Sequence, residues 1–264
     1  MKTIRLNGID FTYDDQGKGP AVLLLSGWCQ DHRLFKTLVP DLARDHRVIN
    51  FDWRGHGLYR GVPQDFGITE QADDLVTFLD ALGVETVLPV STSHGGWANI
   101  AVTDRLGPGR IPQTMVIDWI QTKPVTAFFT ALDEIQNRKT WLKGRQDLFD
   151  YWIGATGNHD VIEHVAVEMA GYDFDMWARS CREIATAYAK WGCPLDRMAA
   201  MSQKRPVTHV FSQPFEEDYH QAQKDFAAGN NWYRPIKLPG ETHFPTLEQP
   251  AAVAREIRAA LQRH

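Results

Sequence analysis

A strand–turn–helix stretch in the first half of the chain constrains the fold most. Residues 87–90 have the apolar composition of a buried strand, and the residues from Trp97 onward are expected to be helical. A strand that ends in a tight turn and restarts as a helix raises one side chain above the sheet edge, and here that side chain is Ser93. Ser91 and Gly95 are small, as this turn requires. The stretch has the form of a nucleophile elbow, with an ordinary strand–helix turn as the alternative.

Strands and helices alternate along most of the chain. Apolar runs typical of buried strands occupy residues 21–25, 47–51, 113–117, 206–211 and 233–238. Helices are expected at residues 33–43, at 69–82 with Thr69 as the cap, and at 250–261, and a hairpin that turns at Asn7 and Gly8 precedes them. This alternation predicts an α/β fold with a mostly parallel sheet flanked by helices.

Several residues of chemical interest directly follow the expected strands. They are Trp28, Ser93, Asp118 and His243. In open parallel sheets, ligands bind beyond the carboxyl ends of the strands. We therefore expect these residues to converge at one edge of the sheet.

The alternation stops between residues 124 and 203. This segment is rich in helix-forming residues and in aromatic side chains. The aromatic residues include Phe128, Phe129, Trp141, Phe149, Tyr151, Trp152, Trp177 and Trp191. Such a segment suits a cap over a binding site. We expect residues 1–123 and 204–264 to form the two parts of one core, and residues 124–203 to form a helical cap.

Composition indicates the class of protein and argues against some partners. With 264 residues, 43% of them hydrophobic and 23% charged, the chain suits one globular domain with a modest insertion. The net charge of −5 arises without a basic block, so neither nucleic acid nor an anionic membrane is an expected partner. Three scattered cysteines, a start without a signal-like core and no apolar run of about 18 residues favour the cytoplasm.

His243 and Asp118 form the expected catalytic pair. An imidazole has an unperturbed pKa of about 6.5, which suits a general base near neutral pH, and a surface-loop histidine is the alternative. A carboxylate on one ring nitrogen would orient the imidazole and stabilise its charged form. Asp118 directly follows a strand, whereas the first carboxylate after the strand at residues 206–211 is Glu216. Ser93 would be the nucleophile of a hydrolase.

The sequence shows no pattern for a cofactor or a metal. It has no G-x-G-x-x-G after a strand and no phosphate-binding loop. Its ten histidines include no compact set with metal-ligand spacing. His159 and His164 lie off the spacing of a zinc-binding helix and are expected to be solvated or to pack within the cap. His56 and Cys29 are expected to be structural.

Six segments together carry a resemblance to a known family. They are residues 27–32 (GWCQDH), 93–97 (SHGGW), 117–119 (IDW), 149–152 (FDYW), 209–214 (HVFSQP) and 242–245 (THFP). With the RGHG loop at residues 54–57, the chain resembles the α/β-hydrolase fold over nearly its full length. Within that fold it is similar to the cofactor-free bacterial 2,4-dioxygenases of 3-hydroxy-4(1H)-quinolones.

The resemblance implies a reaction and a role for each candidate residue. Such an enzyme cleaves 3-hydroxy-4(1H)-quinolone with O2 and releases carbon monoxide and N-formylanthranilate, with neither metal nor organic cofactor. His243, steadied by Asp118, would remove the proton of the 3-hydroxyl, and Ser93 would be an auxiliary hydrogen-bonding group. The backbone N–H groups of Trp28 and His94 would form an oxyanion hole.

A small heteroaromatic substrate also needs a flat binding surface. Trp28 and Trp152 are the candidates for stacking on its ring, and His32, Gln30 and Trp119 are further candidates for its pocket. The resemblance leaves the C2 substituent of the ring and the oligomeric state open.

Two other functions are consistent with these residues. One is a serine hydrolase, either an esterase or a C–C bond hydrolase, that uses Ser93, His243 and Asp118. The other is a non-enzymatic receptor on the same fold, which would bind the ring without consuming O2.

Overall fold

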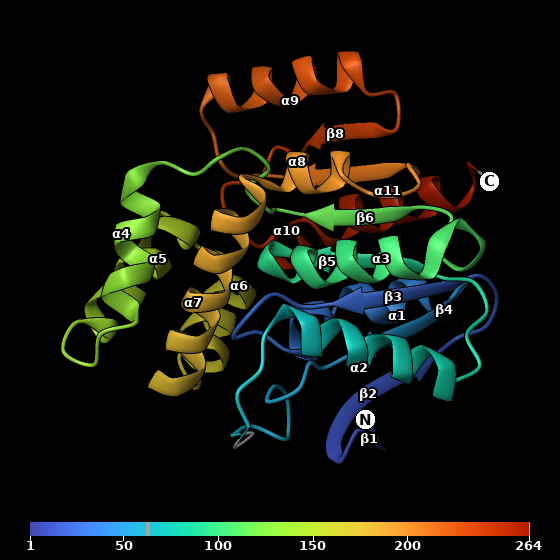
Figure 1. The fold of residues 1–264 in the computed structure, drawn as a ribbon, viewed down its shortest axis with the longest axis horizontal. Helices are drawn as coiled ribbons and strands as arrows, with labels where there is room; N and C mark the ends of the chain where they lie inside the picture. Colours follow the sequence, from blue (N-terminus) through green and yellow to red (C-terminus); the bar gives the residue numbers. More distant parts are fainter. Residues whose placement is uncertain (62–63, 264) are drawn as a thin grey trace.

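A single mixed sheet organises the molecule. In the computed structural model, which describes residues 1–61 and 64–263, eight strands form this sheet in the order β1-β2-β4-β3-β5-β6-β7-β8 (Figure 1). They are β1 (Lys2–Leu6), β2 (Ile9–Gln16), β3 (Ala21–Leu25), β4 (Arg47–Phe51), β5 (Leu88–Thr92), β6 (Thr114–Ile117), β7 (Val207–Phe211) and β8 (Tyr233–Lys237). β2 pairs antiparallel with β1 and β4, and all other pairs are parallel. The predicted α/β fold with a mostly parallel sheet is confirmed.

Local sequence explains these strands. Asn7 and Gly8 have positive φ angles of 52° and 79°, the geometry that closes a two-residue hairpin between β1 and β2. The central strand β3 reads Ala-Val-Leu-Leu-Leu, and successive side chains of a strand face opposite sides of the sheet. Leu23 packs in one hydrophobic cluster and Leu24 in the other. Both faces of the sheet are therefore buried, which accounts for the continuous apolar run.

Helices cover both faces of the sheet. α2 (Ile68–Ala81) and α3 (Gly96–Arg110) lie on one face, and α1 (Leu38–Leu42) and α11 (Pro250–Leu261) lie on the other (Figure 1). Phe78 of α2 shares a hydrophobic cluster with Leu23, whereas Ile257 of α11 lies in the other cluster. Three short helical elements lie in the loops: η1 (His32–Phe35), η2 (Ser93–Gly95) and α10 (Pro245–Glu248). The longer helix α9 (Glu217–Gly229) connects β7 to β8.

The segment between β6 and β7 is helical. It contains α4 (Thr126–Ile135), α5 (Trp141–Ile153), α6 (His159–Glu163), η3 (His164–Met169), α7 (Phe174–Trp191) and α8 (Pro194–Ala199). α4 to α7 lie at the end of the sheet toward which the parallel strands point (Figure 1). They are therefore close to the loops that carry the candidate residues. The division into a core and a cap at residues 124 and 203 stays a prediction.

Two expected helix boundaries are wrong. Residues 33–43 form η1 and α1 in place of one helix. Pro40 explains the break, because a proline ring in a continuous helix clashes with the carbonyl of the residue four positions earlier, here Lys36. Thr69 is not the cap of α2, since the helix begins at Ile68 and Gly67 is the N-cap residue.

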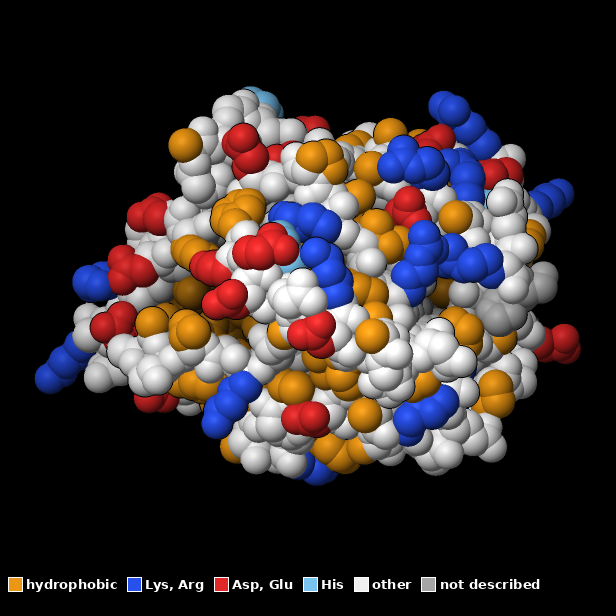
Figure 2. Space-filling view, turned by 90° about the horizontal axis from the view of Figure 1, so that it is seen from above, with side chains coloured by type: hydrophobic (Ala, Val, Ile, Leu, Met, Phe, Trp, Pro, Cys, Tyr) orange, Lys and Arg blue, Asp and Glu red, His pale blue; other side chains and the backbone are white. Residues whose placement is uncertain are grey.

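The outer surface carries side chains of both charges. On the face shown in Figure 2, acidic, basic and hydrophobic side chains are interspersed. The net charge of −5 is therefore not gathered into one continuous acidic area on that face. Within residues 1–61 and 64–263, every helix is too short or too polar to cross a membrane.

Candidate active site

The turn after β5 has the geometry of a nucleophile elbow. Ser93 directly follows β5 and has a φ of +48°, and α3 begins at Gly96. A non-glycine residue with positive φ is strained, and such strain is found where a turn raises a functional side chain. A small residue is needed at Gly95, because a Cβ there would lie 2.3 Å from the carbonyl oxygen of Ser26. The close approach of the two backbones therefore explains the small residue after the elbow.

Asp118 is held by three hydrogen bonds at the end of β6. Its Oδ1 lies 2.7 Å from Nδ1 of His243, and its Oδ2 accepts the backbone N–H groups of Ser212 at 2.7 Å and Gln213 at 3.1 Å. The residue is 2% exposed and has a φ of +45°. Because β6 and β7 are neighbours, the residues after β7 reach this carboxylate directly. The carboxylate is therefore held in one orientation, facing the imidazole.

His243 lies between this carboxylate and the elbow serine. Its Nε2 is 3.0 Å from Oγ of Ser93, and its backbone N–H donates to the carbonyl of Trp152 at 2.9 Å. A carboxylate only accepts hydrogen bonds, so Nδ1 carries the proton toward Asp118, and Nε2 of the neutral ring is an acceptor. The Trp152 ring stacks on the imidazole, with centroids 5.2 Å apart and an interplanar angle of 20°. Both a core loop and α5 therefore orient the imidazole.

In the loop after β3, side chains hold the backbone N–H groups on either side of Trp28. Gly27 donates its N–H to Oε1 of Gln30 at 3.0 Å, and Cys29 donates its N–H to Nε2 of His56 at 3.1 Å. Among the described residues, the N–H of Trp28 between them has no acceptor. A Cβ on Gly27 would lie 3.1 Å from the Cβ of the elbow serine, so this loop packs closely against the elbow. The Trp28 amide is thus available to an oxygen that gains negative charge there.

His94 places a neutral imidazole beside the base. Burial, with a further contribution from the nearby His243, lowers the pKa of His94 to about 3. Its Nδ1 is buried without a hydrogen-bond partner in the part of the chain that the structure describes. The ring packs against Phe128 and Tyr188, at centroid distances of 5.7 and 5.8 Å. The side chain of His94 is therefore neutral near neutral pH.

Two narrow cavities adjoin at the elbow. Both are lined by Ser93, His94, Phe128 and Trp152. The first is also lined by Asp118, Ile120, Tyr151, Gln213, Pro214 and His243, and the second by Trp28, Gln30, Leu132, Leu148, Trp177, Ser180, Cys181 and Ile184. Each has a volume of ≈ 20 Å³, which is room for about one water molecule. Mostly apolar walls with a few convergent polar groups are typical of a site for a small organic molecule.

Two residues expected in the pocket lie elsewhere. Nδ1 of His32 pairs with Asp52 at 2.7 Å. Burial lowers the pKa of His32, but the carboxylate of Asp52 outweighs this effect, and the pKa is raised. The ring of Trp119 fills the space beside Gly96 and meets Trp97 edge-on, with centroids 4.9 Å apart. Neither His32 nor Trp119 lines the two cavities. The other residues expected at the site lie in the walls of one or both cavities.

Gln213, for which the sequence indicated no role, links three parts of the site. Its side-chain Nε2 donates to the carbonyl of Glu241 at 3.0 Å and to that of Trp152 at 3.3 Å, while its backbone N–H binds Asp118. It therefore ties α5 to the loop that carries His243. Its place shortly after a buried strand was a usable signal, because Ser93 and Asp118 also follow the ends of buried strands closely.

In the part of the chain that the structure describes, two groups of side chains have ligand atoms close enough to hold a metal, although sequence spacing indicated none. They are Asp31, His32 and Asp52, and His159, Asp160 and Glu163, each with ligand atoms within 4.8 Å of one another. Both groups already have partners within the protein. Asp31 pairs with Arg33, and Lys36 pairs with both Asp160 and Glu163. Neither group lines the cavities at the elbow.

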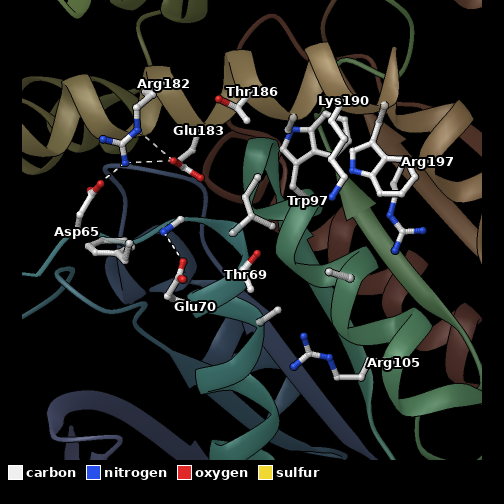
Figure 3. A pocket seen from close by; sticks show the side chains of 17 residues that line it. Asp65, Thr69, Glu70, Trp97, Arg105, Arg182, Glu183, Thr186, Lys190 and Arg197 are labelled. Atoms are coloured by element: carbon white, nitrogen blue, oxygen red, sulfur yellow. Dashed lines mark hydrogen bonds and ion pairs between the residues drawn. The ribbon is translucent and has the colours of Figure 1, made fainter.

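A wider groove lies between α2, α3 and α7, outside this site (Figure 3). Arg182 on its rim contacts both Asp65 and Glu183. Phe66 on its wall stacks on Trp28, with centroids 5.7 Å apart and an interplanar angle of 7°. Two aromatic rings therefore separate this groove from the second cavity, and none of the three hydrogen-bonded site residues lines it.

Comparison with known proteins places the chain in a family. Residues 22–256 match the alpha/beta hydrolase family. The chain is 48% identical to 1H-3-hydroxy-4-oxoquinoline 2,4-dioxygenase of Pseudomonas putida, over 99% of this chain and 100% of that protein. It is 42% identical to 2-heptyl-3-hydroxy-4(1H)-quinolone dioxygenase of Mycobacteroides abscessus, over 97% and 96% of the two chains. A solved structure of 1H-3-hydroxy-4-oxoquinoline 2,4-dioxygenase matches with a TM-score of 0.96 at 47% identity and covers 99% of this chain and 100% of that one. The chain therefore belongs to the α/β-hydrolase family and, within it, to the ring-cleaving dioxygenases of 3-hydroxy-4-quinolones.

Proposed function

We propose that this chain cleaves 3-hydroxy-4(1H)-quinolone with O2 and releases carbon monoxide and N-formylanthranilate. One observation carries the proposal: Asp118, His243 and Ser93 form a chain of hydrogen bonds beside the Trp28 amide, which has no acceptor among the described residues. The substrate carries adjacent groups that fit this arrangement, an acidic 3-hydroxyl and a carbonyl at C4. Family membership supports this chemistry over that of a hydrolase.

The first step is removal of the 3-hydroxyl proton by His243. Nε2 of the neutral imidazole is the acceptor of this proton. It lies 3.0 Å from Oγ of Ser93, so a substrate hydroxyl beside that serine is within its reach. Asp118 stabilises the imidazolium that forms, because its Oδ1 accepts the Nδ1 proton at 2.7 Å. The hydroxyl of Ser93 assists as a hydrogen-bonding group and forms no covalent intermediate.

The second step is stabilisation of the ring anion. Negative charge spreads from the 3-oxygen onto the C4 oxygen, which the amides of Trp28 and His94 bind. One such donor contributes roughly 2.7–4 kcal/mol where it has been removed from other enzymes. The neutral side chain of His94 supports this role, because a second imidazolium beside His243 would oppose protonation of the base.

The anion then reacts with O2 at C2. The peroxide formed at C2 closes onto C4, and the bridged intermediate collapses as the C2–C3, C3–C4 and O–O bonds break. C3 leaves with its own oxygen as carbon monoxide. Both atoms of O2 remain in N-formylanthranilate, one in the formyl group and one in the carboxylate.

Binding of the ring requires movement of the walls. A bicyclic ring is far larger than the ≈ 20 Å³ of either cavity. Phe128 of α4 and Trp152 of α5 line both cavities, and movement of their side chains would enlarge the space at the elbow. We infer that substrate entry involves these helices, while the dyad and the oxyanion loop stay in place.

The experiment that tests the proposal measures O2 uptake, carbon monoxide release and the incorporation of ¹⁸O into the product. Chelator-treated protein is supplied with ¹⁸O2 and 3-hydroxy-4(1H)-quinolone, O2 uptake is recorded with an electrode, and carbon monoxide is trapped by reduced myoglobin. We expect one mole of carbon monoxide per mole of O2, without label, and two labelled oxygens in the product. A product labelled from water, or ring cleavage without O2 uptake, contradicts the proposal.

A serine hydrolase is the second candidate, because Nε2 of His243 is 3.0 Å from Oγ of Ser93. An ester panel and a phosphonate serine trap separate the two activities. Fast ester turnover with a stable adduct on Ser93 would support the hydrolase, and slow turnover without an adduct supports the dioxygenase. A receptor would bind the quinolone but leave O2 unconsumed.

A further inference from the structure

Three successive amides of the loop after β3 differ in their partners. Those of Gly27 and Cys29 are held by side chains, and that of Trp28 is free among the described residues. The two holding groups come from different places: Gln30 belongs to the same loop, whereas His56 lies in the loop after β4. Cys29 itself has a φ of +56°, which a residue other than glycine rarely adopts. This backbone conformation therefore needs support from the surrounding structure.

His56 is built as a permanent hydrogen-bond acceptor. Its Nδ1 lies 2.9 Å from the carbonyl oxygen of Arg54, which can only accept, so Nδ1 carries the proton and Nε2 has the free electron pair. The residue is 1% exposed, and burial lowers the pKa of His56 to about 4. The ring therefore stays neutral at the pH where His243 acts as a base, and its Nε2 can accept the Cys29 N–H at 3.1 Å.

The same ring also contacts the side chain of the oxyanion residue. It meets the indole of Trp28 at a centroid distance of 6.0 Å and an interplanar angle of 64°. On its other side it lies 5.3 Å from the ring of Tyr172. His56 thus touches Trp28 through its indole and binds the amide that follows it. Loss of the acceptor would leave the buried Cys29 N–H unpaired, and the loop could pair it only by turning.

We propose that His56 is a positioning residue for the oxyanion hole: by holding the Cys29 N–H, it leaves the Trp28 N–H free for the C4 oxygen of the substrate. The identity of that oxygen rests on the proposed function. The hydrogen bond itself does not, and it can be tested without substrate.

Three variants separate this role from a contribution to folding. His56→Leu fills the place with an apolar side chain and removes the acceptor, and His56→Gln restores an acceptor oxygen near the place of Nε2. His209→Leu is the matched control, because His209 is also fully buried, with a pKa lowered to about 4 by burial, but binds Gln223 and lines neither cavity. Each variant is assayed for kcat, KM and melting temperature, and for the absorption spectrum of quinolone bound without O2.

The anaerobic spectrum reports the ionisation of the bound substrate directly. We expect His56→Leu to lower kcat roughly 10- to 100-fold with little change in KM, since an oxyanion donor acts on developing charge. The pKa of the bound 3-hydroxyl should rise by roughly 1 to 2, which is the same change in anion stability. His56→Gln should recover most of both effects. His209→Leu should lower the melting temperature and leave the bound spectrum and kcat near those of the wild type.

A measurement on the substrate-free wild type keeps the inference testable if a variant fails to fold. A scalar coupling between the Cys29 nitrogen and Nε2 of His56 across the hydrogen bond is expected in an NMR experiment on ¹⁵N-labelled protein. Absence of that coupling overturns the inference, as does His56→Leu with the kcat and bound-substrate spectrum of the wild type. Wild-type protein that shows the coupling but neither binds nor oxidises the quinolone contradicts the proposed function and leaves the positioning of the Trp28 amide supported.

Discussion

The two sides of the proposed active site, the base side with His243 and the oxyanion side with Trp28, are built from opposite kinds of group. On the base side, the carboxylate of Asp118 is hydrogen-bonded to His243, which becomes positively charged when it accepts a proton. Backbone amides after β7 complete the hydrogen bonds of the carboxylate. On the oxyanion side, Trp28 offers a backbone amide, and the neighbouring His56 and His94 are kept neutral by burial. A group that takes up a proton needs a counter-charge. A group that only stabilises charge works best as a fixed dipole that does not titrate.

We expect the largest loss of activity from a substitution on the base side. His243→Ala removes the proton acceptor, so kcat should fall by roughly 10²–10⁴-fold in O2-uptake assays at saturating quinolone. His159→Ala, at an exposed histidine on α6, is the control and should match the wild type. Retention of more than about a tenth of wild-type kcat by His243→Ala would show that the base lies elsewhere.

Asp118→Asn tests whether the carboxylate sets the tautomer. The amides of Ser212 and Gln213 would hold the oxygen of the new side chain, which points its NH2 group at Nδ1 of His243. Nδ1 would then accept a hydrogen bond, and the ring proton would lie on Nε2. In that tautomer Nε2 cannot accept the proton of the substrate. We expect kcat to fall roughly 10²-fold, less than for loss of the imidazole. Asp225→Asn on the exposed face of α9 is the control, and equal kcat in the two variants would contradict this role.

The neutral histidines of the oxyanion side predict a loss of stability in acid. The folded-state pKa of His56 is about 4, below the ordinary value near 6.5 expected in the unfolded chain. Between these values the unfolded state binds a proton that the folded state does not, so the free energy of unfolding falls as pH falls, by about 1.4 kcal/mol per pH unit for each such residue. Urea unfolding of the wild type and of His56→Gln between pH 7 and 5 measures this. The variant should have the shallower pH dependence, and parallel curves would mean that His56 is protonated in the folded state.

Ser93→Ala should have the smallest effect. A single hydrogen bond contributes about 0.5–1.5 kcal/mol, so a loss of roughly three- to tenfold in kcat is expected for an auxiliary hydroxyl. Ser93→Gly, which also relieves the φ of +48°, separates loss of the hydroxyl from backbone strain. If Ser93→Ala were as inactive as His243→Ala, the serine would be a nucleophile. Its role as an auxiliary hydrogen-bonding group would then be wrong.

Much of the site could be predicted because it depends on where strands end. Ser93, Asp118 and His243 each follow an apolar run, and parallel strands bring such positions to one edge whatever their distance in the chain. Trp119 and His32 share that kind of position, but the structure places their side chains elsewhere. Residue type does not reveal the direction of a side chain in a loop, which depends on local φ values and on long-range partners such as Asp52 for His32.

The strands, the elbow and the residues that gather beyond it could be predicted from the chain alone, because apolar periodicity and turn chemistry are local properties. The partner of each polar group, by contrast, follows from the three-dimensional arrangement. The pairing of His56 with Cys29 and the link from Gln213 to Trp152 join residues 27 and 61 positions apart. Such contacts depend on the register of neighbouring strands and on the packing of α5 at the end of the sheet, and no pattern along the chain encodes them.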